Sequence, residues 1–152
     1  MTTHPHIRSR ISAILAATTL VLAGFSLSAG ADDLKFKLSG DQEVPPVSSA
    51  AGGNASITVK PDMSVSGSVT TSGIVGTMAH IHTGKVGMNG PVVVTLEKSG
   101  DNGWNVPAGT KLSDAAYQSY KSGDLYINVH SAEHKPGEIR GQMMPPKTSG
   151  GY

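Results

Sequence analysis

Apolar and polar residues alternate along short stretches of the chain after residue 31. In residues 34–40, Leu34, Phe36 and Leu38 alternate with lysine and serine, and residues 124–131 follow the same period of two. Successive side chains of a strand point to opposite faces, so this period predicts β-strands with one buried face. Turn-forming Gly, Pro, Asn and Asp residues separate the alternating stretches, which predicts tight connections between strands.

The same pattern predicts further strands, which lie at 54–59 and 65–71 as a hairpin, at 74–84, at 91–98 and at 138–144. The continuous β-branched run within 91–98 predicts a strand that is covered on both faces. Segments rich in Gly, Pro and Asn are predicted as loops, at 41–53, 85–90 and 99–111.

One helix is predicted over residues 112–123, where Ser113 can cap the start and Gly123 can end it. Many short strands with a single brief helix predict an all-β fold. We expect an immunoglobulin-like or Greek-key β-sandwich, or a barrel, of about seven to eight antiparallel strands with one short helix.

The first 31 residues read as a secretory signal peptide. Arg8 and Arg10 precede an uncharged apolar segment, and Ala29 and Ala31 occupy the small-residue positions before a predicted cut. An uncleaved membrane anchor is the alternative for this segment. We therefore expect a signal peptide over 1–31, one folded domain over 32–145 and a flexible tail over 146–152, in a protein that is periplasmic or secreted and no longer attached to a membrane.

Charge and composition limit the classes of partner. The chain has 12 basic and 11 acidic residues, and removal of residues 1–31 takes away two arginines, which leaves a net charge of −1. A nearly neutral domain without a basic run does not favour a nucleic acid or an anionic membrane as a partner. The chain has no cysteine, which excludes disulfides and thiolate ligands.

The histidines after residue 31 occupy two short motifs. In "TMAHIHTG" the side chains of Met78, His80 and His82 are two residues apart and so share one face of the predicted strand. The other motif, "NVHSAEH", contributes His130 and His134. Imidazole is a ligand for copper and zinc, so two such motifs on neighbouring strands would form a metal site. The alternative is that these histidines only pack or form hydrogen bonds.

Three separated motifs resemble the CHRD domain family, which is named for the modules of chordin and includes single-domain exported bacterial members. They are "LSGDQEVPP", then "AHIHTG" followed by "NGPVVVTL", then "GDLYINVHSAEHKPGEIRGQM", and the resemblance runs from Leu34 to Met143. It implies an all-β, immunoglobulin-like extracellular domain. The family's H-x-H motif falls on His80 and His82, and its "NVH" motif falls on His130.

We predict a copper site with His80, His82 and His130 as ligands and with Met78 or His134 as a fourth. Copper is favoured over zinc because thioethers are available nearby, and zinc gains little from a soft ligand.

Metal-bound histidines usually donate their free nitrogen to a carboxylate or a carbonyl, so residues near His130 are candidates for this supporting shell. They are Glu133, Glu138 and Asn128. Glu138 and Arg140 alternate on one strand, which equally predicts an ion pair between them.

The sequence therefore predicts an exported copper-binding protein that handles copper or transfers electrons. Its partners would be the metal ion and a redox or metal-transfer protein, and a homodimer is compatible with the sequence. No motif for a catalytic nucleophile or for an acid–base pair is present, so we expect no enzyme. Two alternatives stay open: a metal-free adhesion or scaffold module that binds a protein through exposed loops, with Trp104 as its anchor, and a copper-dependent oxidoreductase.

Overall fold

The computed structural model describes residues 1–2 and 30–147. Most of the predicted signal peptide and the tail residues 148–152 lie outside the described residues. Among the residues that are described, no helix is long and apolar enough to span a bilayer.

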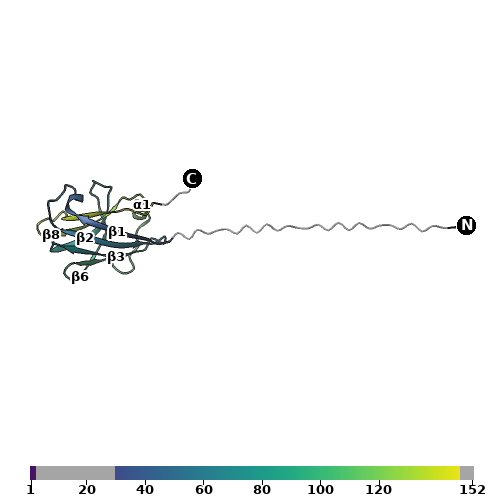
Figure 1. Cartoon of the computed structure of the whole chain (residues 1–152), viewed down its shortest axis with the longest axis horizontal. Coiled ribbons are helices and arrows are strands. Elements are labelled where there is room, and N and C mark those ends of the chain that lie inside the picture. Colours follow the sequence, from purple (N-terminus) through teal and green to yellow (C-terminus); the bar gives the residue numbers. More distant parts are fainter. Residues whose placement is uncertain (3–29, 148–152) are drawn as a thin grey trace.

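The fold is an all-β, nearly closed barrel of nine antiparallel strands with one short helix. The elements, in chain order, are β1 (Asp32–Ser39), the 3-10 turn η1 (Gly40–Gln42), β2 (Gly52–Val59), β3 (Val65–Ser72), β4 (Gly76–Thr83), β5 (Val92–Thr95), β6 (Glu97–Ser99), β7 (Gly103–Asn105), α1 (Asp114–Lys121), β8 (Leu125–Ser131) and β9 (Ile139–Met143). The strand order is β5-β4-β8-β9-β1-β2-β3-β7-β6, and β1, β2 and β3 run side by side (Figure 1). The predicted fold class is confirmed, with the barrel as the arrangement that is present.

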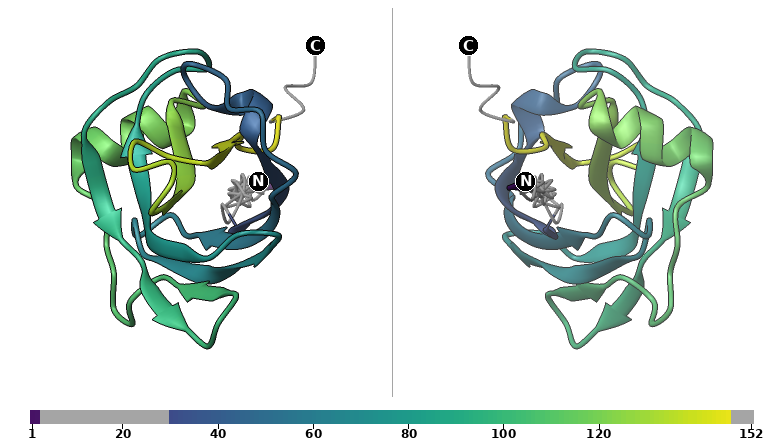
Figure 2. Two further views of the ribbon diagram at one scale, coloured as in Figure 1. Left: turned by 90° about the vertical axis from the view of Figure 1, so that its left-hand side faces the viewer. Right: turned by 90° about the vertical axis from the view of Figure 1, so that its right-hand side faces the viewer.

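One segment, residues 92–99, joins the two ends of the sheet. Its first half, β5, pairs with β4, and its second half, β6, pairs with β7. Between them the Leu96 amide donates to the carbonyl of Ala79 at 2.9 Å, and the Leu96 side chain enters the core. The strands therefore curve around one interior (Figure 2).

This closure corrects two predictions. Residues 91–98 do not form one strand covered on both faces: Val92 is 51% exposed, and every residue of β6 is exposed. The segment 99–111, predicted as a loop, contains the strand β7. A change of pairing partner at Leu96 leaves no trace in the apolar pattern, which explains why the prediction fell short of nine strands.

The interior of the barrel contains the apolar positions predicted by the period of two. On β8 these are Leu125, Ile127 and Val129, and each is completely buried. The polar positions between them are buried as well, so all seven residues of β8 are buried. Two loops cover this outer face: the Asn89 amide of one loop donates to the carbonyl of Val44 in the other at 2.7 Å. The strand is thus covered on both sides although its sequence alternates.

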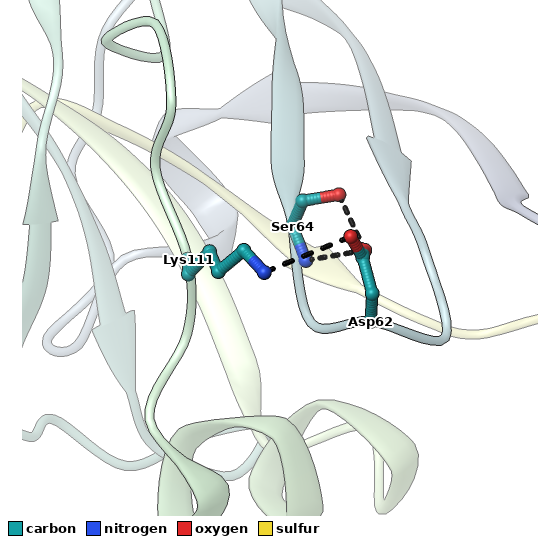
Figure 3. A network of polar contacts seen from close by, with 3 residues as sticks. All are labelled: Asp62, Ser64 and Lys111. Atoms are coloured by element: carbon teal, nitrogen blue, oxygen red, sulfur yellow. Dashed lines mark hydrogen bonds and ion pairs between the residues drawn. The ribbon is translucent and has the colours of Figure 1, made fainter.

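The predicted helix and hairpin are present. Ser113 caps α1 by accepting a hydrogen bond from the Ala116 amide at 3.2 Å, and Gly123 follows the helix with a φ of 75°, a left-handed conformation that suits glycine. In the turn between β2 and β3, Asp62 accepts two hydrogen bonds from Ser64 and pairs with Lys111 at 3.8 Å (Figure 3). Both partners of that ion pair are exposed, so it contributes little stability.

Trp104 does not lie on an exposed loop, contrary to the expectation for an adhesion module. Its side chain is only 3% exposed on β7, where a Cβ added to Gly76 would lie 2.9 Å from the indole ring. The Lys98 ammonium lies 4.7 Å from the centroid of the indole ring and donates to the carbonyl of Gly76. The indole therefore seals the barrel at its closure.

Removal of this indole tests the closure. We expect Trp104→Ala to lower the free energy of unfolding by about 3–5 kcal/mol, because it leaves a large cavity in a packed core. Urea denaturation followed by circular dichroism measures the change. Val86→Ala, at an exposed loop position, is the control and should change the stability by no more than about 0.5 kcal/mol. An unchanged midpoint for Trp104→Ala would contradict the packing described.

Candidate metal centre

The strands β4 and β8 bring three histidines together on the outer face of the sheet. In the ladder Met78 lies opposite His130, His80 opposite Asn128, and His82 opposite Tyr126. Because the side chains of alternate residues share a face, His80, His82 and His130 all point away from the barrel interior. One ligand nitrogen from each of His80, His82 and His130 lies within 4.8 Å of the others. This cluster could hold a metal ion.

Backbone carbonyls orient two of the three rings. The Nδ1 atom of His130 lies 2.8 Å from the carbonyl oxygen of Lys135, and the Nδ1 atom of His82 lies 2.9 Å from that of Gly90. A carbonyl only accepts, so both Nδ1 atoms carry a proton and donate it. Each Nε2 atom is then left with its lone pair, which is the form that binds a metal.

The third ring is held by another histidine. Nδ1 of His80 lies 2.9 Å from Nε2 of His130. Since His130 Nε2 is an acceptor, His80 Nδ1 donates a proton to it in the metal-free state. Ligand nitrogens at about 2.0–2.1 Å from a tetrahedral ion are about 3.3 Å apart, close to the separation of this pair, so a metal ion could take the place of this proton when the proton moves to Nε2 of His80.

His82 stacks on an aromatic ring, and that ring in turn contacts a cation. Its ring stacks on Tyr126 with an interplanar angle of 5° and a centroid distance of 4.9 Å. The Arg140 guanidinium lies 3.5 Å from the centroid of the Tyr126 ring. Arg140 is itself anchored, because it donates to the carbonyls of Lys85 and Met88. The His82 ring is thus packed against a fixed surface.

The electrostatic environment favours neutral imidazoles. Burial lowers the pKa of His80 below its usual value, and the neighbouring His130 and His82 lower it further. Burial also lowers the pKa of His82, although the hydrogen bond to Gly90 opposes this shift. Both rings are therefore unprotonated at neutral pH and available as ligands.

The other predicted site residues have different places. Met78 is on the same face, directly opposite His130, and is 49% exposed. His134 is in the turn between β8 and β9 and is not a member of the three-histidine group. Glu133 is exposed in that turn. The structure therefore gathers the three predicted histidines and leaves His134 apart.

Backbone carbonyls, rather than the predicted carboxylates, accept the hydrogen bonds that the Nδ1 atoms of His82 and His130 donate. Glu138 is buried but accepts from Ser49 Oγ at 2.6 Å. It does not pair with Arg140, since the ion pair between Asp62 and Lys111 is the one formed within residues 1–2 and 30–147. Asn128 is close to the cluster, where its side chain raises the pKa of His82 and so lies within reach of that ring.

Sequence reasoning missed Glu43. This residue of the predicted surface loop is folded inward and only 5% exposed. Burial raises its pKa to about 7, against the opposing effects of the Arg140 charge and of hydrogen bonds from the Val44 backbone and the Asn128 side chain. A charged residue in "DQEVPP" gives no signal of burial by itself, because the covering is made by a distant loop.

A carboxyl with this pKa makes folding depend on pH. The folded state keeps the Glu43 proton up to a pKa of about 7 and the unfolded state loses it near 4.5, so the stability contributed by Glu43 is lost as the pH rises from 4.5 through 7. Glu43→Gln removes this dependence. Relative to the unchanged protein, the variant should gain up to about 3 kcal/mol in unfolding free energy between pH 5 and pH 8.

Urea denaturation at the two pH values measures this gain. The shifts at His80 and His82 oppose it, since their stability is lost as the pH falls below 6.5, but they are common to both proteins and cancel in the difference. Glu133→Gln, at an exposed position, is the matched control and should show the same difference at both pH values. A pH-independent difference for Glu43→Gln would contradict the burial of a titrating carboxyl.

The chain matches the model of a known domain family. The model of the CHRD domain matches residues 34–143, which include both histidine motifs and Glu43. No curated protein and no solved structure matches the chain.

Proposed function

Because the chain belongs to the CHRD domain family, and its domain carries a convergent histidine cluster, we propose that it is an exported copper-binding protein that handles copper or transfers electrons. Its ligands are His80, His82 and His130. The observation that carries the proposal is the approach of three imidazole nitrogens, from two strands, to within 4.8 Å of one another. Three such ligands leave a further coordination position open.

The choice of copper follows from the donors around the cluster. Nitrogen sites bind Cu(II) more tightly than other divalent first-row ions, and a thioether adds affinity for Cu(I). The thioether of Met78 is on the same face as the histidines and is half-exposed beside His130. The absence of cysteine argues against a blue-copper centre, because those centres need a thiolate. A site of this kind suits capture and transfer of the ion.

Export is part of the proposal. It is supported by the apolar segment after Arg8 and Arg10 and by the small residues before Asp32. N-terminal sequencing of the protein recovered outside the cytoplasm should give Asp32 as its first residue. A copper protein in that compartment meets Cu(II). This chain has no cysteine thiol that would compete with the histidines for the ion.

The ligand set is tested by replacing the histidines one at a time. His80→Ala, His82→Ala and His130→Ala should each lower copper affinity by more than about a hundredfold, because loss of even a supporting residue around a metal commonly costs 10–100-fold. Competition with a chelator of known affinity, monitored by absorption and electron spin resonance, gives the constants for Cu(II), and a Cu(I)-selective chelator gives them for Cu(I).

His134→Ala is the matched control, since His134 is a nearby histidine outside the cluster; its copper affinity should equal that of the unchanged protein. Zinc is titrated in parallel and should bind more weakly than copper. Stoichiometric tight binding that persists in His80→Ala and His130→Ala would overturn the ligand assignment.

A further inference from the structure

Unsatisfied polar atoms accumulate beside the histidine cluster. Four buried side-chain polar atoms have no hydrogen-bond partner within the described part of the chain: Glu43 Oε1, His82 Nε2, Asn128 Oδ1 and Trp104 Nε1. The first three come from residues that neighbour one another. Glu43 Oε1 borders the same space beside Gly137 as Asn128 Nδ2, a donor, so the two atoms that lack a donor beside the cluster are His82 Nε2 and Asn128 Oδ1. Buried polar groups without partners are rare in folded proteins, so two that face one another indicate a missing ligand.

Asn128 lies beside the three histidines, on the same face of the sheet. It lies opposite His80 in the ladder between β4 and β8, two residues before His130 and within reach of His82. Its side chain is 2% exposed. A ligand bound among the three histidines on this side therefore has the Asn128 amide as its next neighbour.

The orientation of that amide is fixed from behind. Asn128 Nδ2 donates to the carbonyl of Pro136 at 3.4 Å. A Cβ at Gly137 would clash with both Asn128 Nδ2 and Glu43 Oε1, so these two atoms border the same small space beside Gly137. With Nδ2 directed at Pro136 and Glu43, the amide oxygen is directed at the histidines.

Two acceptors then face one another. His82 Nε2 has a lone pair because its Nδ1 proton is donated to Gly90, and Asn128 Oδ1 only accepts. A metal ion on His82 Nε2 satisfies the first acceptor. The second needs a hydrogen donor, and a donor held by the metal is the group that can reach it.

We propose that the open coordination position of the copper site holds a small hydrogen-donating oxygen ligand, water in the resting protein, whose O–H group is accepted by Asn128 Oδ1. Glu43 is a positioning residue that keeps the Asn128 amide turned in this direction. The position therefore selects small protic ligands, such as water or a peroxide, over anions that only accept hydrogen bonds. This inference rests on the proposed copper site and names the class of ligand that completes it.

Electron–nuclear double resonance on the Cu(II)-loaded full-length protein tests the proposal. Strongly coupled protons that vanish in D₂O identify a water on the ion. We expect them in the unchanged protein, and we expect Asn128→Leu to lose or weaken them at full copper stoichiometry. Azide, an anion that only accepts hydrogen bonds, should bind Asn128→Leu at least about tenfold more tightly, because the opposing acceptor is gone.

Asn54→Leu, at an exposed position on β2, is the matched control and should match the unchanged protein in both measurements. If Asn128→Leu does not fold, Asn128→Asp decides: the added negative charge should retain the water and weaken azide binding at least about tenfold. Unchanged azide affinity in the variant that folds would overturn the proposal.

Other ligands at this position give distinct results. Copper bound by the three histidines without exchangeable coupled protons, as a thioether or a fourth imidazole would produce, overturns this inference and leaves the copper site intact. Failure of the unchanged protein to bind copper refutes the proposed function, and the inference with it.

Discussion

The buried guanidinium of Arg140 is the constraint on which the site depends. Its side chain is 1% exposed, and a buried charge is tolerated only when its donors are satisfied. The chain satisfies them with the carbonyls of Lys85 and Met88, the Asn89 side chain and Gln142. The loop between β4 and β5 must therefore fold over the sheet.

The folded loop creates the ligand geometry. It brings the carbonyl of Gly90 to His82 Nδ1, and the Gly90 amide reaches the Tyr126 hydroxyl at 3.3 Å. Through Asn89 it also holds the loop that contains Glu43. The same covering removes water from the rings, which lowers the pKa values of His80 and His82. Burial of the Arg140 charge thus leads both to the orientation of the His82 ring and to the neutral state of His80 and His82.

The sequence contained the fold class and the face on which each histidine lies, because both depend on local periodicity, whereas the pairing of β4 with β8 that joins the histidines is a contact between remote segments. The spacing of two in the first histidine motif determines its shared face, and alternation in 124–131 places His130 on the outer face of β8. The periodicity of the sequence does not show which distant loop covers a given face of the sheet. For that reason the inward position of Glu43, the carbonyls that orient His82 and His130, and the partner of Arg140 were not predictable. The closure at Leu96 and the burial of Trp104 were missed on the same ground, because both depend on strand pairing between remote segments.

The three histidines are not equivalent, and the difference bears on how a metal ion is captured. His82 and His130 are each held by a backbone carbonyl, so their lone pairs are oriented before any ion arrives. The Nδ1 atom of His80 is held by the neighbouring imidazole instead, and His80 is the more exposed ring. An ion bound here would meet two fixed nitrogens, and the proton on His80 Nδ1 would move to the Nε2 atom of the same ring, which leaves the backbone in place. Two oriented nitrogens beside one more exposed ring suit the reversible binding of a metal that we propose.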